Sequence, residues 1–163
     1  MSLRESGHAE DVPEARLAAL GLTLPEVSAP LAAYVPAVRT GEYVYTAGQL
    51  PVVDGQLLAT GKVGADIGAV EASALARACA LNALAAVASV TGGLAAVRRI
   101  VKVTGFVASA PSFIQQAQVV NGASELLIEV LGEAGRHARS AVGMAVLPLD
   151  APVEVELIAE VRD

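Results

Sequence analysis

The stretch from Asp66 to Val90 places the strongest constraint on how this 163-residue chain can fold. It contains no proline, its one glycine, Gly68, stands near its start, and the pair Gly92-Gly93 follows its end. A long uninterrupted run closed by glycine predicts a helix. Apolar side chains, mostly alanine, occupy nearly the whole circumference of that helix. We therefore expect one face to lie on a sheet and another to meet a neighbour.

Shorter segments on both sides of this helix carry strand and helix patterns. The expected elements are a short helix over 12–24, strands over 34–39 and 43–47, an extended piece over 56–63, a strand over 99–108, a helix over 113–131, and strands over 138–146 and 153–161. One mixed β-sheet covered on one face by two long helices accommodates this order, which is an α+β fold. We assign residues 1–29 to an N-terminal extension with a short helix and residues 30–163 to a single domain.

The charge balance limits the partners of this chain. Its 17 acidic and 11 basic residues give a formal net charge of −6, which disfavours binding to nucleic acid or to anionic membranes. Only 17% of the residues are charged while 54% are hydrophobic, so a monomer would be short of solvating surface. This imbalance predicts a homo-oligomer. The uncharged runs 78–97 and 103–124 contain too many polar, glycine or proline residues for membrane spans.

Cysteine and histidine are scarce. A single cysteine, Cys79, excludes an intramolecular disulfide, and the two histidines, His8 and His137, form no zinc motif with it. The first 13 residues lack the pattern of a secretory signal. We therefore expect a reducing, cytoplasmic location and no metal. Phosphate-binding loops, dinucleotide fingerprints and nucleophile elbows are also missing from the sequence.

Arg139 and Glu154 are the two charged residues best placed for chemistry. Arg139 stands at the head of an apolar strand, where a guanidinium can bind a carboxylate or form a strand-end salt bridge. Glu154 and Glu156 alternate with aliphatic residues, so both face one side of the last strand, in a site or in solvent. If the last two strands form a hairpin, Arg139 pairs near Glu160 and lies roughly 20 Å from Glu154. A site containing both would then combine two chains.

Other polar residues have two interpretations each. Tyr34, Gln49 and Asn121 are either ligand contacts or structural polar groups. His137 lies on the same side of its strand as Arg139 and either titrates near a site or is an exposed loop histidine. Cys79, between alanines in a helix, is expected to be a small buried hydrophobe.

Several short motifs occur together in a distinctive order between about residues 30 and 161. They are Tyr34-Val35, Thr46-Ala47-Gly48-Gln49-Leu50-Pro51-Val52, Val120-Asn121, Ala138-Arg139-Ser140-Ala141-Val142, Leu147-Pro148 and Val153-Glu154-Val155-Glu156. This set resembles the YjgF/RidA family, also labelled endoribonuclease L-PSP. The resemblance implies a chorismate-mutase-like fold, a homotrimer, and clefts between subunits. It also implies hydrolytic deamination of reactive enamines and imines, such as 2-aminoacrylate, to 2-oxo acids and ammonia, without metal or cofactor.

The resemblance also implies roles for individual residues. Arg139 would bind the substrate carboxylate, and Glu154 would position or deprotonate the attacking water. The residues that would line the cleft are Tyr34, Gly48, Gln49, Asn121, Ser140 and Ala141. The substrate or product would be a small imine or 2-oxo acid that carries a carboxylate.

The sequence also departs from the family pattern. Ala47 replaces a common hydroxyl residue, Ala141 replaces a common cysteine, His137 stands where proline is usual, and one extra residue separates Asn121 from Arg139. With the N-terminal helix, these differences resemble a longer subgroup. Three alternatives to the deaminase therefore stay open: a non-catalytic trimer that binds small carboxylates or a stress-related partner, an endoribonuclease or translation inhibitor, and a mutase by fold analogy alone.

Overall fold

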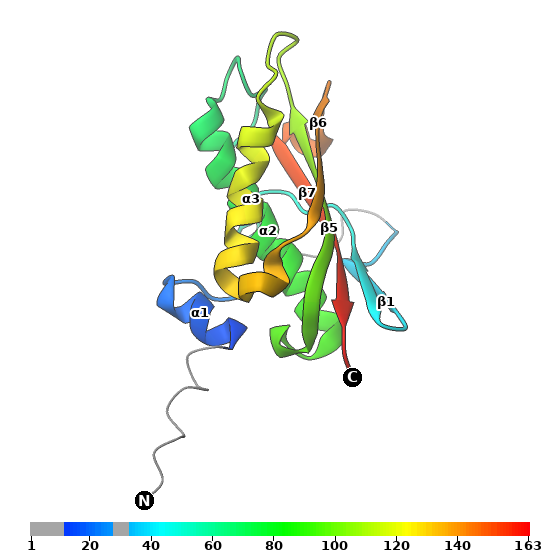
Figure 1. Cartoon of the computed structure of the whole chain (residues 1–163). Helices are drawn as coiled ribbons and strands as arrows, with labels where there is room; N and C mark the ends of the chain where they lie inside the picture. The colour runs from blue at the N-terminus through cyan, green and yellow to red at the C-terminus, as the bar shows by residue number, and fades with distance from the viewer. Residues whose placement is uncertain (1–11, 28–32) are drawn as a thin grey trace, which may run out of the picture.

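Two long helices cover one face of a five-stranded sheet (Figure 1) in the computed structural model, which describes residues 12–27 and 33–163. The helices are α1 (Pro13–Ala19), α2 (Ala69–Thr91) and α3 (Gln116–Leu131), with the short 3-10 turns η1 (Leu94–Ala96), η2 (Gly132–Gly135) and η3 (Pro148–Asp150). The strands are β1 (Ala37–Thr40), β2 (Tyr43–Thr46), β3 (Val52–Val53), β4 (Gln56–Leu57), β5 (Val97–Ala108), β6 (Ala138–Met144) and β7 (Val153–Val161). The predicted α+β fold, with one mixed sheet and two helices on one face, is confirmed.

The strand order in the sheet is β1-β2-β7-β5-β6. Strands β1, β2, β7 and β5 pair antiparallel, whereas β6 pairs parallel to β5 after the chain crosses over through α3. The hairpin considered for the last two strands is wrong, because β5 lies between β6 and β7. The segment with η3, which connects β6 to β7, therefore crosses over the end of β5 instead of forming a tight turn. There Ala108 N, at the end of β5, donates to Pro152 O at 2.9 Å. As a result, β7 pairs with β2 along one edge and with β5 along the other.

Helix α2 forms the centre of the core. Its buried side chains contact both the sheet and α3, so the neighbour expected from its all-round apolar surface is another helix of the same chain. The two helices cross closely at Gly122, where an added Cβ would lie 1.9 Å from the backbone oxygen of Ser73. Within the described part of the chain, α2 is the one helix long and apolar enough to cross a membrane. Its burial against the sheet and α3 is typical of a core helix.

Several element boundaries differ from those expected. Of the extended piece expected over 56–63, only residues 56–57 form a strand, β4, which pairs with β3 in a small hairpin turned by Asp54 and Gly55 with φ of 51° and 77°. Positive φ at both turn positions matches the twist of a tight hairpin. β1 begins after Pro36, and α3 begins at Gln116 rather than at residue 113 because residues 111–115 form a loop.

Helix α1 lies beside the end of α3 (Figure 1) and is fixed to the domain. Leu17 is buried in the core, and the Glu14 carboxylate accepts a hydrogen bond from Leu94 N at 3.0 Å. The N-terminal extension is thus attached to the domain through α1, although the expected boundary at residues 29 and 30 lies outside the described residues.

The other face of the sheet is not covered by helices. Residues Val153, Val155 and Leu157 of β7 are buried under the helices, so the alternating Glu154 and Glu156 point to the uncovered side. Apolar side chains share that side: Val38 is 52% exposed and pairs with Tyr45, which is 46% exposed. The fold therefore presents a partly apolar sheet face to its surroundings.

Candidate functional site

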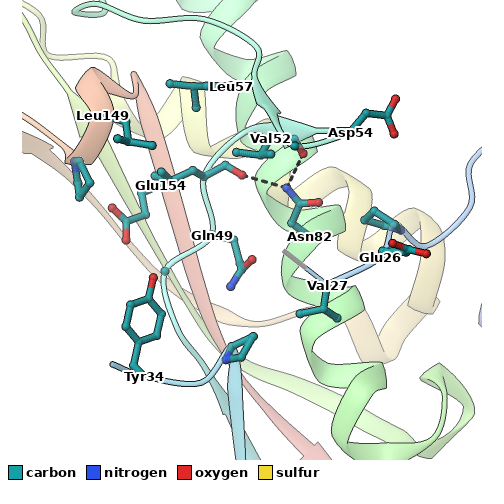
Figure 2. A pocket seen from close by; sticks show the side chains of 16 residues that line it. Glu26, Val27, Tyr34, Gln49, Val52, Asp54, Leu57, Asn82, Leu149 and Glu154 are labelled. Carbon is teal, nitrogen blue, oxygen red and sulfur yellow. Dashed lines mark hydrogen bonds between the residues drawn. The ribbon is translucent and has the colours of Figure 1, made fainter. Parts of the chain in front are cut away.

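A cavity of about 640 Å³ lies where the segment that follows β2, the start of β7, α2 and the β3–β4 hairpin meet (Figure 2). Four of the predicted site residues line it, namely Tyr34, Gly48, Gln49 and Glu154. The remaining lining residues are Pro25, Glu26, Val27, Pro36, Leu50, Val52, Asp54, Gly55, Leu57, Asn82, Pro148 and Leu149. The segment 25–27 follows α1, so the N-terminal extension forms part of the wall.

The Glu154 carboxylate occupies the space beside Gly48 that a side chain would fill. A Cβ at position 48 would lie 1.7 Å from Glu154 Oε1, so only glycine leaves room for the carboxylate there. Gln49 continues the antiparallel pairing of β2 with β7 by exchanging backbone hydrogen bonds with Val155, at 2.8 and 3.0 Å. The sequence Gly48-Gln49 thus fixes the chain beside β7 and sets the position of Glu154.

Glu154 has an unusual electrostatic environment for a carboxyl group. Partial burial raises its pKa above the ordinary glutamate range, and the nearby Glu156 raises the pKa further. Glu26 and Asp54 also line the cavity, and no lysine or arginine is found among its described lining residues. The cavity by itself therefore offers no cation to a substrate carboxylate.

Asn82 was not identified as a site residue from the sequence. Its buried side-chain amide donates hydrogen bonds to Leu50 O at 3.0 Å and Val52 O at 2.9 Å (Figure 2). These bonds fix to α2 the loop that carries Gly48 and Gln49. The sequence feature that could have identified it is a single amide side chain within the apolar run of α2.

Cys79, one helical turn before Asn82, is buried as predicted. Its Sγ lies 3.6 Å from Val153 O. Burial raises the pKa of the thiol well above its usual value, and the charge of Glu154 adds to this shift. A buried thiol that resists ionisation is suited to packing and not to nucleophilic attack.

Arg139 lies in a second group of polar residues, between β6 and α3. Its Nη1 donates to Asn121 Oδ1 at 2.8 Å and to Ser124 Oγ at 3.2 Å, and its Nη2 donates to Ala117 O at 3.2 Å. A guanidinium has five N–H donors, so two remain for a ligand after these bonds to described residues. These partners are neutral oxygens, which leaves the positive charge available to bind a carboxylate.

The predicted site residues therefore fall into two groups within one chain. Arg139 pairs with Val103 on β5, whereas Glu154 pairs with Phe106, three residues further along the same strand. Two strand spacings and three residues separate their Cα atoms by about 14 Å, which replaces the 20 Å derived from the wrong hairpin. Their side chains also point to opposite faces of the sheet, so they cannot contact one ligand carboxylate together.

The two residues after Arg139 differ in their surroundings. Ala141 shares the helix-facing side with Arg139 and packs against the core. Ser140 points to the uncovered face, where its hydroxyl accepts a hydrogen bond from Lys102 Nζ at 3.1 Å. The second group thus comprises Arg139 and Asn121 with Ala141 beside them, and Ser140 lies apart. In the described ranges 12–27 and 33–163, no group of three or more His, Cys, Asp or Glu side chains could hold a metal ion.

The mixed sheet, the two helices on one face and the domain size define a chorismate-mutase-like α+β protein. The chain belongs to the YjgF/RidA family, whose model, described as "YjgF/chorismate mutase-like, putative endoribonuclease", matches residues 14–161. The match begins within α1.

Three relatives illustrate this similarity. Protein TCP17 from Trypanosoma cruzi is 45% identical over 150 residues, which cover 91% of this chain and 94% of that protein. The crystal structure of Atu1372 from Agrobacterium tumefaciens is 48% identical with a TM-score of 0.87, covering 94% of this chain and 95% of that one. The crystal structure of Escherichia coli TdcF, which contains bound serine, is 28% identical with a TM-score of 0.60, covering 85% of this chain and 93% of that one.

Proposed function

We propose that this protein is a hydrolytic deaminase that converts small, reactive 2-imino acids and their enamine tautomers to 2-oxo acids and ammonia. The observation that carries the proposal is the pair of half-sites. One half holds an arginine with two N–H donors left over, and the other is a cavity with a carboxyl group of raised pKa. A substrate with a carboxylate and an electrophilic carbon requires both. The serine bound to TdcF, itself a small molecule with a carboxylate, supports this substrate class.

We further propose that the two halves meet between copies of the chain in a homotrimer. The uncovered face of the sheet supports this assembly, because it exposes apolar side chains, among them Tyr45, Val142 and Met144. Burial of this face against further copies would supply the driving force for association. A ring of three copies would contain three clefts, each with Arg139 from one copy and Glu154 from the next.

The chemistry requires positioning and one proton acceptor. Arg139 holds the substrate carboxylate by two N–H bonds, which places the imine carbon in the neighbouring cavity. The ionised Glu154 takes a proton from water as the water oxygen bonds to that carbon, the C=N electron pair moves to nitrogen, and the protonated Glu154 returns the proton to that nitrogen. Glu154 then takes the hydroxyl proton of the resulting carbinolamine and passes it to the amine as the C–N bond breaks, the C=O bond forms and ammonia leaves. The raised pKa of Glu154 makes this carboxylate a stronger base near neutral pH.

The test is the release of ammonia or 2-oxo acid from imines that an amino-acid oxidase generates in situ. Wild-type protein should accelerate release over buffer, and Arg139→Ala should abolish most of that acceleration. Arg136→Ala is the matched control, because Arg136 is exposed and pairs with Glu133 at 3.0 Å, away from the cavity. Absence of acceleration with every imine, from a folded oligomer, would contradict the deaminase.

The same experiment distinguishes the deaminase from the alternative, a trimer that binds carboxylates without turnover. That alternative predicts saturable binding of a 2-oxo acid that depends on Arg139, with no release of ammonia.

The endoribonuclease label of the family is disfavoured for this chain by its net charge of −6 and by the three carboxylates that line the cavity. A free, buried Cys79 is compatible with the reducing cytoplasm as the place of action.

A further inference from the structure

A chain of hydrogen bonds connects His137 to the guanidinium of Arg139. His137 Nδ1 lies 2.6 Å from Gly135 O, and its Nε2 lies 2.9 Å from Ser124 Oγ. The same Ser124 oxygen accepts a hydrogen bond from Arg139 Nη1 at 3.2 Å. Ser124 of α3 thus lies between the two side chains, of which Arg139 is on β6 and His137 stands just before that strand.

The chemistry of these atoms sets the direction of each bond. A carbonyl oxygen only accepts, so Nδ1 of His137 must carry a hydrogen and donate it to Gly135 O. In the neutral ring Nε2 is then an acceptor, and the Ser124 hydroxyl donates to it. With its hydrogen committed in this way, the Ser124 oxygen presents its lone pairs to Arg139.

Protonation of His137 would reverse one of these bonds. An imidazolium donates from both nitrogens, so Ser124 would have to accept from His137 and Arg139 at once, with two positive charges close together. Burial lowers the pKa of His137; the Gly135 bond opposes this shift and the positive charge of Arg139 adds to it. The ring is therefore neutral at neutral pH, and the arrangement that favours Arg139 is the resting one.

Several of the other charged groups around His137, Ser124 and Arg139 have partners of their own. In the preceding turn η2, Glu133 is paired with Arg136. On β5, Lys102 donates to Ser140 on the opposite face of the sheet. On α3, Glu129 is paired with Arg77 of α2, and Glu125 is the remaining acidic residue of that helix.

We propose that His137, acting through Ser124, is a positioning residue that holds the Arg139 guanidinium with its two remaining N–H donors available to the substrate carboxylate. This inference rests on the proposed function, in which Arg139 binds that carboxylate. His137 and Ser124 do not touch the reacting atoms, so they affect substrate affinity and leave the chemical step largely unchanged.

The first test follows KM and kcat for imine hydrolysis between about pH 5 and 8. KM of the wild type should rise as the pH falls and His137 gains a proton. His137→Gln supplies an uncharged acceptor for the Ser124 hydroxyl and should remove this rise, with kcat within about twofold of wild type. Ser124→Ala should raise KM roughly tenfold at neutral pH, as expected for the loss of one hydrogen bond to a charged group. An unchanged pH profile in His137→Gln, or an unchanged KM in Ser124→Ala, would overturn the proposal.

A second readout does not depend on turnover. Nitrogen-15 NMR of the imidazole rings should show His137 as the Nδ1–H tautomer at neutral pH, with His8→Gln used to assign the two histidines of the sequence. The Arg139 Nη signals should broaden in Ser124→Ala and, for the wild type, in acid. If these signals behave as expected while no imine is hydrolysed, the proposed function is wrong but the positioning of Arg139 by His137 and Ser124 is supported. If imines are hydrolysed but His137 is the other tautomer, the positioning role of His137 is wrong and the proposed function is supported.

Discussion

Mixing two inactive variants provides the most informative test of the divided site. The variants are Arg139→Ala and Glu154→Gln, each of which removes one half. Arg139 has two N–H donors available to a carboxylate, and hydrogen bonds to charged groups contribute about 1.5–3 kcal/mol each. Their joint loss of at least about 3 kcal/mol lowers kcat/KM on the order of 10²-fold, since 1.36 kcal/mol is one factor of ten. Loss of the Glu154 proton acceptor should lower it on a similar scale, about 10²-fold or more.

The expected recovery follows from the separation of the two residues. Arg139 and Glu154 lie about 14 Å apart on opposite faces of one sheet, so a working cleft takes one residue from each of two neighbouring chains. When equal amounts of the variants are unfolded, mixed and refolded, each cleft has a chance of one half for each intact residue. About one quarter of the clefts are then complete, and ammonia release should recover to about one quarter of the wild-type value.

The prediction would be refuted if mass measurements show that mixed oligomers have formed but the mixture is as inactive as each variant alone. That outcome would mean that both residues act within one chain. Mixing the Arg136→Ala control with wild type should give full activity in every proportion, which checks that refolding itself is not limiting.

Three further predictions concern the cavity. Gly48→Ala should lower kcat on the order of 10²-fold with little change in Tm, because the added Cβ displaces the Glu154 carboxylate, which a thermal melt and the ammonia assay can check together. Asn82→Ala should lower the free energy of unfolding by about 2 kcal/mol, read from the urea midpoint, because it leaves Leu50 O and Val52 O without their donor; an unchanged midpoint would contradict this role. Glu154 binds its proton more tightly in the folded state, so folding stability should fall as the pH rises from the ordinary glutamate pKa through the raised one. Urea titrations at several pH values should show that Glu154→Gln removes this fall and is more stable than wild type at neutral pH.

The sequence predicted the sheet and its two covering helices because their patterns are local. The strict alternation of β7 and the uninterrupted α2 each depend on side chains a few residues apart. The pairing of β6 with β5 could not be predicted in this way, since it depends on the crossover through α3 and not on the turn that follows β6. Proximity along the chain favoured a hairpin, and that choice was wrong.

The candidate site could be predicted only in part for a similar reason. Arg139, Asn121 and Glu154 stood out as polar residues in apolar segments and Gly48 was implied by the family resemblance, and the structure places each next to another member of the set. Asn82 was missed because its importance lies in the two carbonyls it reaches in a distant loop. No local pattern reports such a contact.

The alanine-rich surface of α2 also determines how the protein can change. Ala72, Ala76, Ala80, Ala83 and Ala86 are completely buried, so nearly every substitution at these positions adds volume. Overpacking costs typically 1–3 kcal/mol per site, whereas alanine itself loses no side-chain entropy on folding. Sequence drift in this helix is therefore limited by crowding and not by cavity formation. Variation should accumulate instead on the exposed side of α3 and in the segment that follows α1, where the cavity can acquire new selectivity without any change to the core.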